Sequence, residues 1–101
     1  MYTFTATVWK YPGQAGNWYF VSLPKKEAQK IKAAYTGKRK GWGSIRVLAQ
    51  VGETEWATSI FPDKKMDTYL LPIKASIRKK QGITTQKKVR ISITLIQNTV
   101  V

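Results

Sequence analysis

The chain contains neither cysteine nor histidine, and these two absences remove much of the chemistry that a small protein could perform. Without cysteine there is no disulfide, no thiolate nucleophile and no thiolate metal ligand. Without histidine the chain lacks the commonest general base and the commonest metal-ligating side chain. We therefore expect a protein that is not an enzyme and that uses no metal ion and no cofactor.

Acidic residues are also scarce. The 101 residues include 5 aspartates and glutamates against 18 lysines and arginines, which gives a formal net charge of +13. Glu53 and Glu55 are two residues apart and Asp63 and Asp67 four apart, but both pairs fall near expected turns, where carboxylates serve hairpin ends and ion pairs. A surface this basic attracts polyanions, nucleic acid among them. The alternative, that the charge only maintains solubility, stays open.

Long apolar runs are missing as well. No stretch approaches the roughly 20 apolar residues of a membrane-spanning helix. The first residues alternate between polar and apolar instead of forming the basic and apolar regions of a secretory signal. We expect a cytoplasmic protein without a membrane span. A hydrophobic fraction of 43% is enough for one core, so residues 1–101 are expected to form a single β-barrel domain.

What the sequence does contain is alternation. Residues 2–11, 44–51 and 88–95 alternate, with Phe4, Ala6 and Val8 on one face of the first segment and an apolar residue at every second position of the other two, which is the period of a strand with one buried face. Three further segments are rich in β-branched and aromatic residues and are flanked by turn residues. These are also predicted strands: 18–23, 54–61 and 68–71. Residues 24–36 and 72–81 begin with proline, repeat apolar residues at helical spacing and end before glycine, so they predict helices.

The two predicted helices follow the same dipeptide. Leu23-Pro24 and Leu71-Pro72 each end a strand and start a lysine-rich helix, and they are 48 residues apart (71 − 23 = 48). Each half of the chain reads strand, strand, helix, strand, which suggests two copies of one unit that cover each other's apolar faces. The expected fold is mainly β: a pseudo-twofold, closed or nearly closed β-barrel with two short helices capping its ends. Since one chain completes it, we expect a monomer.

Five stretches that cover nearly the whole chain in order carry a resemblance to a known family: residues 16–24 (GNWYFVSLP), 41–44 (GWGS), 51–52 (VG), 56–62 (WATSIFP) and 69–79 (YLLPIKASIRK). In these stretches the chain resembles domain of unknown function 1905, a set of small prokaryotic proteins. The resemblance implies a double-split β-barrel, the fold that small dimeric regulators and antitoxins assemble from two chains. The chain differs from the family at residues 85–89, where relatives tend to have a Gly-Asp turn before the last strand.

One candidate site surrounds a tryptophan between two glycines. In this interpretation Trp42 stacks on a base or sugar ring inside a basic rim formed by Lys38, Arg39, Lys40 and Arg46. The alternative is a turn in which glycine permits an unusual backbone angle and Trp42 seals one end of the barrel. The other tryptophans are interpreted as core residues.

A second candidate site lies at the start of the second predicted helix. Lys74 and Arg78 are four residues apart near a helix N-terminus, which favours anions, and Lys79 and Lys80 extend the positive field. The alternative is that Arg78 pairs with Asp63 or Asp67 and fastens the helix to the preceding loop.

These observations lead to one hypothesis and one alternative about function, and a third class, an enzyme that acts on an anionic small molecule, has the weakest support. The hypothesis is a non-enzymatic binding module whose basic surface engages nucleic acid or another polyanion, through the nine basic and aromatic residues named at the two sites. The alternative is a structural or protein-interaction domain that serves a neighbouring or fused partner.

Overall fold

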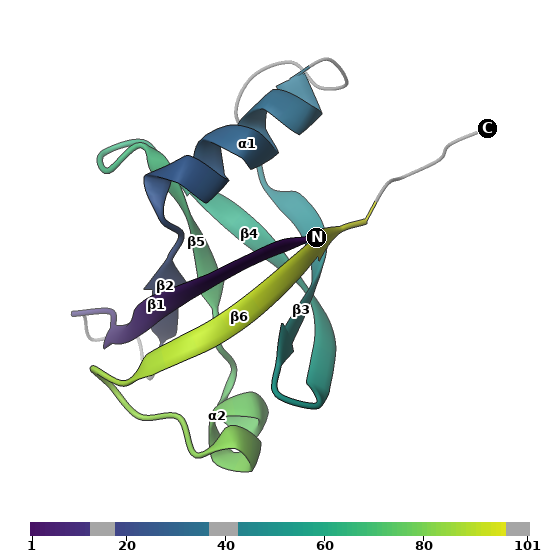
Figure 1. Ribbon diagram of the computed structural model, residues 1–101. Helices are drawn as coiled ribbons and strands as arrows, with labels where there is room; N and C mark the ends of the chain where they lie inside the picture. Colours follow the sequence, from purple (N-terminus) through teal and green to yellow (C-terminus); the bar gives the residue numbers. More distant parts are fainter. Residues whose placement is uncertain (13–17, 37–42, 97–101) are drawn as a thin grey trace.

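The chain folds into a small β-barrel with a helix at each end (Figure 1). The computed structural model describes residues 1–12, 18–36 and 43–96, except for the side chains of residues 35 and 36. The elements, in chain order, are β1 (Tyr2–Lys10), β2 (Tyr19–Ser22), α1 (Lys25–Thr36), β3 (Ile45–Val51), β4 (Thr54–Asp63), β5 (Thr68–Pro72), α2 (Ala75–Gln81) and β6 (Lys88–Leu95). Every predicted strand and helix is present.

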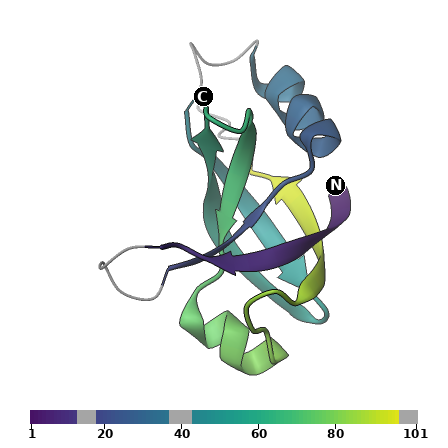
Figure 2. The same cartoon turned by 90° about the vertical axis from the view of Figure 1, so that its left-hand side faces the viewer.

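Six antiparallel strands close the barrel in the order β1-β2-β5-β4-β3-β6. The last strand, β6, lies between β1 and β3, so the end of the described chain completes the ring next to its beginning. Figures 1 and 2 show α1 across one end of the barrel and α2 beneath the other. The predicted mainly β, closed barrel with two capping helices is therefore confirmed.

The strand order has twofold symmetry, because exchanging β1, β2 and β3 with β4, β5 and β6 leaves the ring unchanged. The register agrees with this symmetry where equivalent strands pair. Ser22 of β2 lies opposite Leu70 of β5, and Val47 of β3 lies opposite Leu95 of β6. In both pairs the partners are 48 residues apart, which is the spacing of the two Leu-Pro dipeptides. A pseudo-twofold axis therefore relates the two halves, as the repeat predicted.

Alternation along the strands fills the barrel interior. On β3 and β6 the residues predicted to face inward are buried, apart from the half-buried Leu95; they are Ile45, Val47, Ala49, Val51, Val89, Ile91 and Ile93. The basic residues Lys88 and Arg90 alternate with them and are exposed. Burying each large aliphatic side chain contributes about 1.5–3 kcal/mol, so this face supplies much of the driving force for folding.

Helix α1 covers one end of the barrel with a short apolar stripe. Two residues of α1, Ala28 and Ile31, are buried. The N–H of Ala28 donates to the carbonyl of Pro24 (2.9 Å) in the first turn. The lysines predicted to form a solvated face are exposed: Lys25, Lys26, Lys30 and Lys32. Below this helix the Thr68 hydroxyl donates a buried hydrogen bond to the carbonyl of Leu23 (2.6 Å), which joins β5 to the start of α1.

Helix α2 is shorter than the sequence predicts. It begins at Ala75 and not at Pro72, because Pro72 is the last residue of β5. Pro72 pairs with Phe20, and the N–H of Ile73 still donates to the carbonyl of Tyr19 (2.8 Å) before the chain turns into the helix. Lys74 is the N-cap residue, and Gly82 ends the helix with a φ of 62°. The predicted end at Gly82 is confirmed, and the helix has seven residues.

A residue in the left-handed region precedes β6. Gln86 has a φ of 67°, and its N–H donates to the carbonyl of Val8 (2.7 Å). We predict that Gln86→Gly raises the free energy of unfolding by about 0.5–1 kcal/mol, because relief of the left-handed conformation, about 1–2 kcal/mol, exceeds the added entropy of the unfolded chain, about 0.4–1 kcal/mol. Urea denaturation measures the change.

The matched control for this prediction is Gln29→Gly. Gln29 is exposed within α1, where glycine costs about 1 kcal/mol, so the same substitution should have the opposite sign. A Gln86→Gly protein that is less stable than the parent would contradict the conformational argument.

Candidate binding groove

A groove opens where the barrel wall splits beside α2. Strand β5 ends at Pro72, and β4 pairs with β5 through Phe61, Pro62 and Asp63, so the earlier part of β4 runs past the end of β5. The gap is bordered by β4 on one side and by the start of β2 on the other, and α2 lies below it. Its volume is about 350 Å³. That volume lies near the lower end of the range for small-molecule pockets, about 300–1,000 Å³.

Aromatic rings form one part of the groove. Trp18 precedes β2 and is 53% exposed, and its ring lies nearly parallel to that of Phe20, with 10° between the planes and 6.1 Å between the centroids. Tyr19, the first residue of β2, also lines the groove and is half-buried. Trp56 of β4 is buried against the same space. The groove therefore contains an exposed ring whose orientation is held by a neighbouring ring.

Two cations form the other part of the groove. The guanidinium carbon of Arg78 lies 3.7 Å from the centre of the Tyr19 ring, and the Nε of Arg78 donates to the carbonyl of Ile73 (3.2 Å). A guanidinium over an aromatic face is held by a cation–π interaction. Lys74 lines the same groove and is exposed. Aspartate and glutamate are absent from the described lining, so its charged side chains are all positive.

The structure brings together some of the predicted site residues and separates others. Lys74 and Arg78 share the groove, whereas Lys79 and Lys80 are exposed on α2 and lie outside the described lining. Arg46 lies on β3, where its Nη1 donates to the Ser59 hydroxyl on β4 (3.4 Å), and it is not part of the described lining. Four of the residues predicted as contacts lie outside the described residues: Lys38, Arg39, Lys40 and Trp42.

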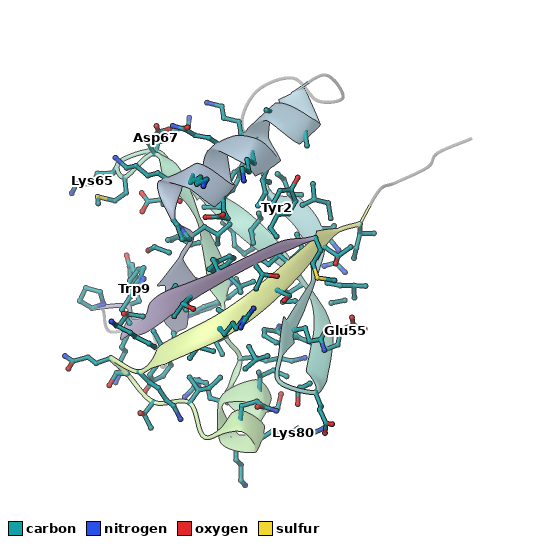
Figure 3. All side chains as sticks on the ribbon, in the orientation of Figure 1. Tyr2, Trp9, Glu55, Lys65, Asp67 and Lys80 are labelled. Carbon is teal, nitrogen blue, oxygen red and sulfur yellow. The ribbon has the colours of Figure 1, made fainter. Side chains whose placement is uncertain are left out.

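The alternative interpretation of Arg78 is wrong. Asp67 lies in the turn between β4 and β5, which Figure 3 places beside α1, at the opposite end of the barrel from α2. Asp63 accepts a hydrogen bond from the Met66 N–H within this turn (3.3 Å). Arg78 contacts Tyr19 instead, because barrel closure brings the start of β2 next to α2.

The interpretation of the tryptophans as core residues is correct for Trp56 and wrong for Trp18. Val21 points into the barrel, so the alternation of a strand directs Phe20 outward, and Trp18 two residues earlier lies on the same side. This period was present in the sequence and could have identified Trp18 as a surface residue. Its place in one groove with Lys74 and Arg78 had no signal in the sequence.

The outer face of the hairpin formed by β1 and β2 is aromatic beyond the groove. The Trp9 ring lies 5.3 Å from that of Phe20, and the Tyr11 ring meets Phe20 edge-on at 6.4 Å. Trp9, labelled in Figure 3, donates from its indole nitrogen to the Ser22 hydroxyl (3.0 Å). We call the rings of Trp9, Tyr11, Trp18 and Phe20 the hairpin cluster.

The described carboxylates lie outside the lining of the groove, and the Nζ of Lys10 lies 6.0 Å from the centre of the Tyr19 ring. Glu55, labelled in Figure 3, is exposed on β4 and Glu53 is exposed in the preceding turn. Burial in the core raises the pKa of the Tyr69 hydroxyl, so this group is uncharged near neutral pH. Within the described residues, carboxylates do not gather in a group of three that could hold a metal ion. Neither described helix is long and apolar enough to cross a membrane.

The fold and groove define a class of protein: a six-stranded barrel closed by two similar halves, with a cationic and aromatic groove at one end. The model of the family described as Domain of unknown function (DUF1905) matches residues 4–93. The chain therefore belongs to this family, as the resemblance in the sequence indicated. No curated protein matches the chain significantly.

Proposed function

We propose that the domain is a non-enzymatic binding module that engages nucleic acid through the groove beside α2. The supporting observation is that Lys74 and Arg78 line one groove with the exposed ring of Trp18 and with no described carboxylate. Proteins that bind single strands combine cations that follow the phosphates with aromatic rings on which bases stack. The net charge of +13 adds a long-range attraction for such a polyanion.

The position of Arg78 favours a defined anion-binding site over a surface that attracts anions only through its overall charge. Its contact with Tyr19 and its bond to Ile73 hold the guanidinium in one place, so little side-chain entropy remains to be lost when an anion binds. The bond to Ile73 engages Nε, so paired hydrogen bonds from Arg78 to a phosphate would use the two Nη groups in the end-on geometry.

The proposal predicts a local effect of charge removal. Lys74→Ala should weaken binding to a labelled single-stranded oligonucleotide and reduce the salt dependence of log K by about 0.7, the contribution of one neutralised single-strand phosphate. Fluorescence anisotropy at several salt concentrations measures both quantities. Lys65→Ala is the matched control, since Lys65 is also exposed but lies at the α1 end of the barrel (Figure 3).

Two results would contradict the proposal. Equal weakening by Lys74→Ala and Lys65→Ala would mean that net charge alone attracts the oligonucleotide. Binding by the parent no tighter than the non-specific range, with Kd of about 10⁻⁴–10⁻⁶ M at physiological salt, would mean that nucleic acid is not the ligand.

The hairpin cluster favours a second candidate, a protein-interaction domain. Trp18 and Tyr11 are about half exposed, at 53% and 50%, and aromatic residues are enriched at protein interfaces. In this candidate the positive charge maintains solubility and the cluster contacts a neighbouring or fused protein. It becomes the favoured function if the oligonucleotide experiment shows only non-specific binding.

A further inference from the structure

We infer that the groove binds one unpaired nucleobase, stacked on Trp18, with the adjoining phosphate at Lys74 and Arg78. The inference rests on the proposed nucleic-acid function and narrows it, because it names single strands over duplexes as the ligand and Trp18 as the residue that recognises the base. It transfers to Trp18 the stacking role that the sequence suggested for Trp42.

The ring of Trp18 has the properties of a stacking platform. It is 53% exposed, and the nearly parallel ring of Phe20 fixes its orientation from one side. Phe20 is itself held by Trp9 and Tyr11, so Trp18 belongs to a packed cluster and is not an isolated flexible side chain. A ring that is already oriented loses little entropy when a base stacks on it.

The cations lie where the phosphate of a stacked nucleotide can reach them. Arg78 and Lys74 line the same groove of about 350 Å³ as Trp18, so a ligand that enters this space meets a ring and positive charge together. The guanidinium is fixed on Tyr19, and the longer, exposed Lys74 side chain can adjust to the anion. A planar group with an attached phosphate satisfies both kinds of lining.

The size of the groove selects for an unpaired base. A pocket of this volume accommodates one small ligand and not the width of a duplex. In a duplex, the base faces are covered by their neighbours, and exposing one costs a few kcal/mol. A single strand offers its bases without that cost, so it is the favoured form.

The pseudo-twofold symmetry gives an internal comparison. The positions 48 residues from Tyr19 and Arg78 are Asp67 and Lys30, at the α1 end of the barrel. The pair of an arginine and a tyrosine therefore occurs at the α2 end and not at the equivalent positions of the α1 end, where Lys30 corresponds to Arg78 and Asp67 corresponds to Tyr19. The groove chemistry does not follow from the barrel architecture alone.

The inference is tested with two oligonucleotides of equal length, oligothymidine and an abasic strand with the same phosphates but no bases. The parent should bind oligothymidine about 5- to 150-fold more tightly than the abasic strand, the range expected from stacking one base. Trp18→Ala should bind the two strands equally, and Trp18→Phe should retain part of the preference because it keeps a ring. Fluorescence anisotropy measures all the affinities.

Phe61→Ala is the matched control, because Phe61 is an exposed ring on β4 (44%) that neither lines the groove nor belongs to the hairpin cluster. It should keep the full preference for bases. Circular dichroism establishes that each variant is folded. A preference that persists in Trp18→Ala, or that Phe61→Ala loses equally, overturns the assignment of Trp18.

The failure of this inference can be told apart from the failure of the proposed function. If the parent binds both strands equally and more tightly than the non-specific range, the domain binds nucleic acid but the stacking site is wrong. If the parent binds neither strand beyond that range, both are wrong. A preference for the duplex of the same sequence also overturns the inference.

Discussion

Cutting the chain at the turn between β3 and β4 should leave two halves that are each unfolded or dimeric. Among the described residues, the strand pairing within the first half is β1 with β2, and within the second it is β4 with β5. The described pairings of β3 and β6 are with strands of the other half, so each fragment loses the partners of its last strand. Circular dichroism and sedimentation of residues 1–52 and 53–101 measure the outcome.

The symmetry specifies how a dimer of one half would form. Two copies of the first half would pair β2 with β2 around Ser22 and β3 with β3 around Val47, since these residues already face their equivalents across the pseudo-twofold axis. The intact chain should then sediment as a monomer, because its own second half occupies those positions. A folded monomeric half, or an obligate dimer of the intact chain, would contradict this account.

Replacing Ile31 with alanine should lower the free energy of unfolding by about 2–5 kcal/mol. Ile31 is fully buried, at 0% exposure, where α1 covers the end of the barrel. The substitution removes buried apolar surface and leaves a cavity at the junction of helix and barrel, both of which destabilise the folded state. Urea denaturation measures the loss.

The neighbouring residue provides the control for this substitution. Lys30 is exposed on α1, and Lys30→Ala should change the stability by no more than about 0.5 kcal/mol. A loss of less than about 1 kcal/mol in Ile31→Ala would indicate that α1 is not needed to close the barrel.

The strands and helices could be predicted because each has a local signal. Strand β6 alternates strictly between apolar and polar residues, and α2 ends at a glycine with a positive φ. The 48-residue spacing of the Leu-Pro dipeptides predicted the relation between the halves, and the pairs Ser22–Leu70 and Val47–Leu95 have this spacing. Pro72 misled the prediction because a proline can either begin a helix or end a strand, and its pairing in the barrel decides which.

The groove could be predicted only in part. Lys74 and Arg78 were identified because their spacing of four places them on one face of a helix. The contact between Arg78 and Tyr19 depends on the antiparallel pairing of β2 with β5, which brings together residues far apart in the chain. No pattern within a short stretch of sequence specifies how β2 pairs with β5. Trp18 was assigned to the core because tryptophan is usually buried in small domains, and its position next to an outward strand residue overrides that tendency.

The fusion of two similar halves into one chain allows the two ends of the barrel to evolve independently. In an assembly of two identical chains every substitution occurs twice, so a change that creates a ligand site at one end also alters the other end. In this chain Arg78 and Tyr19 can change without altering their counterparts Lys30 and Asp67. A substitution beside α2 can therefore be selected without a matching change beside α1.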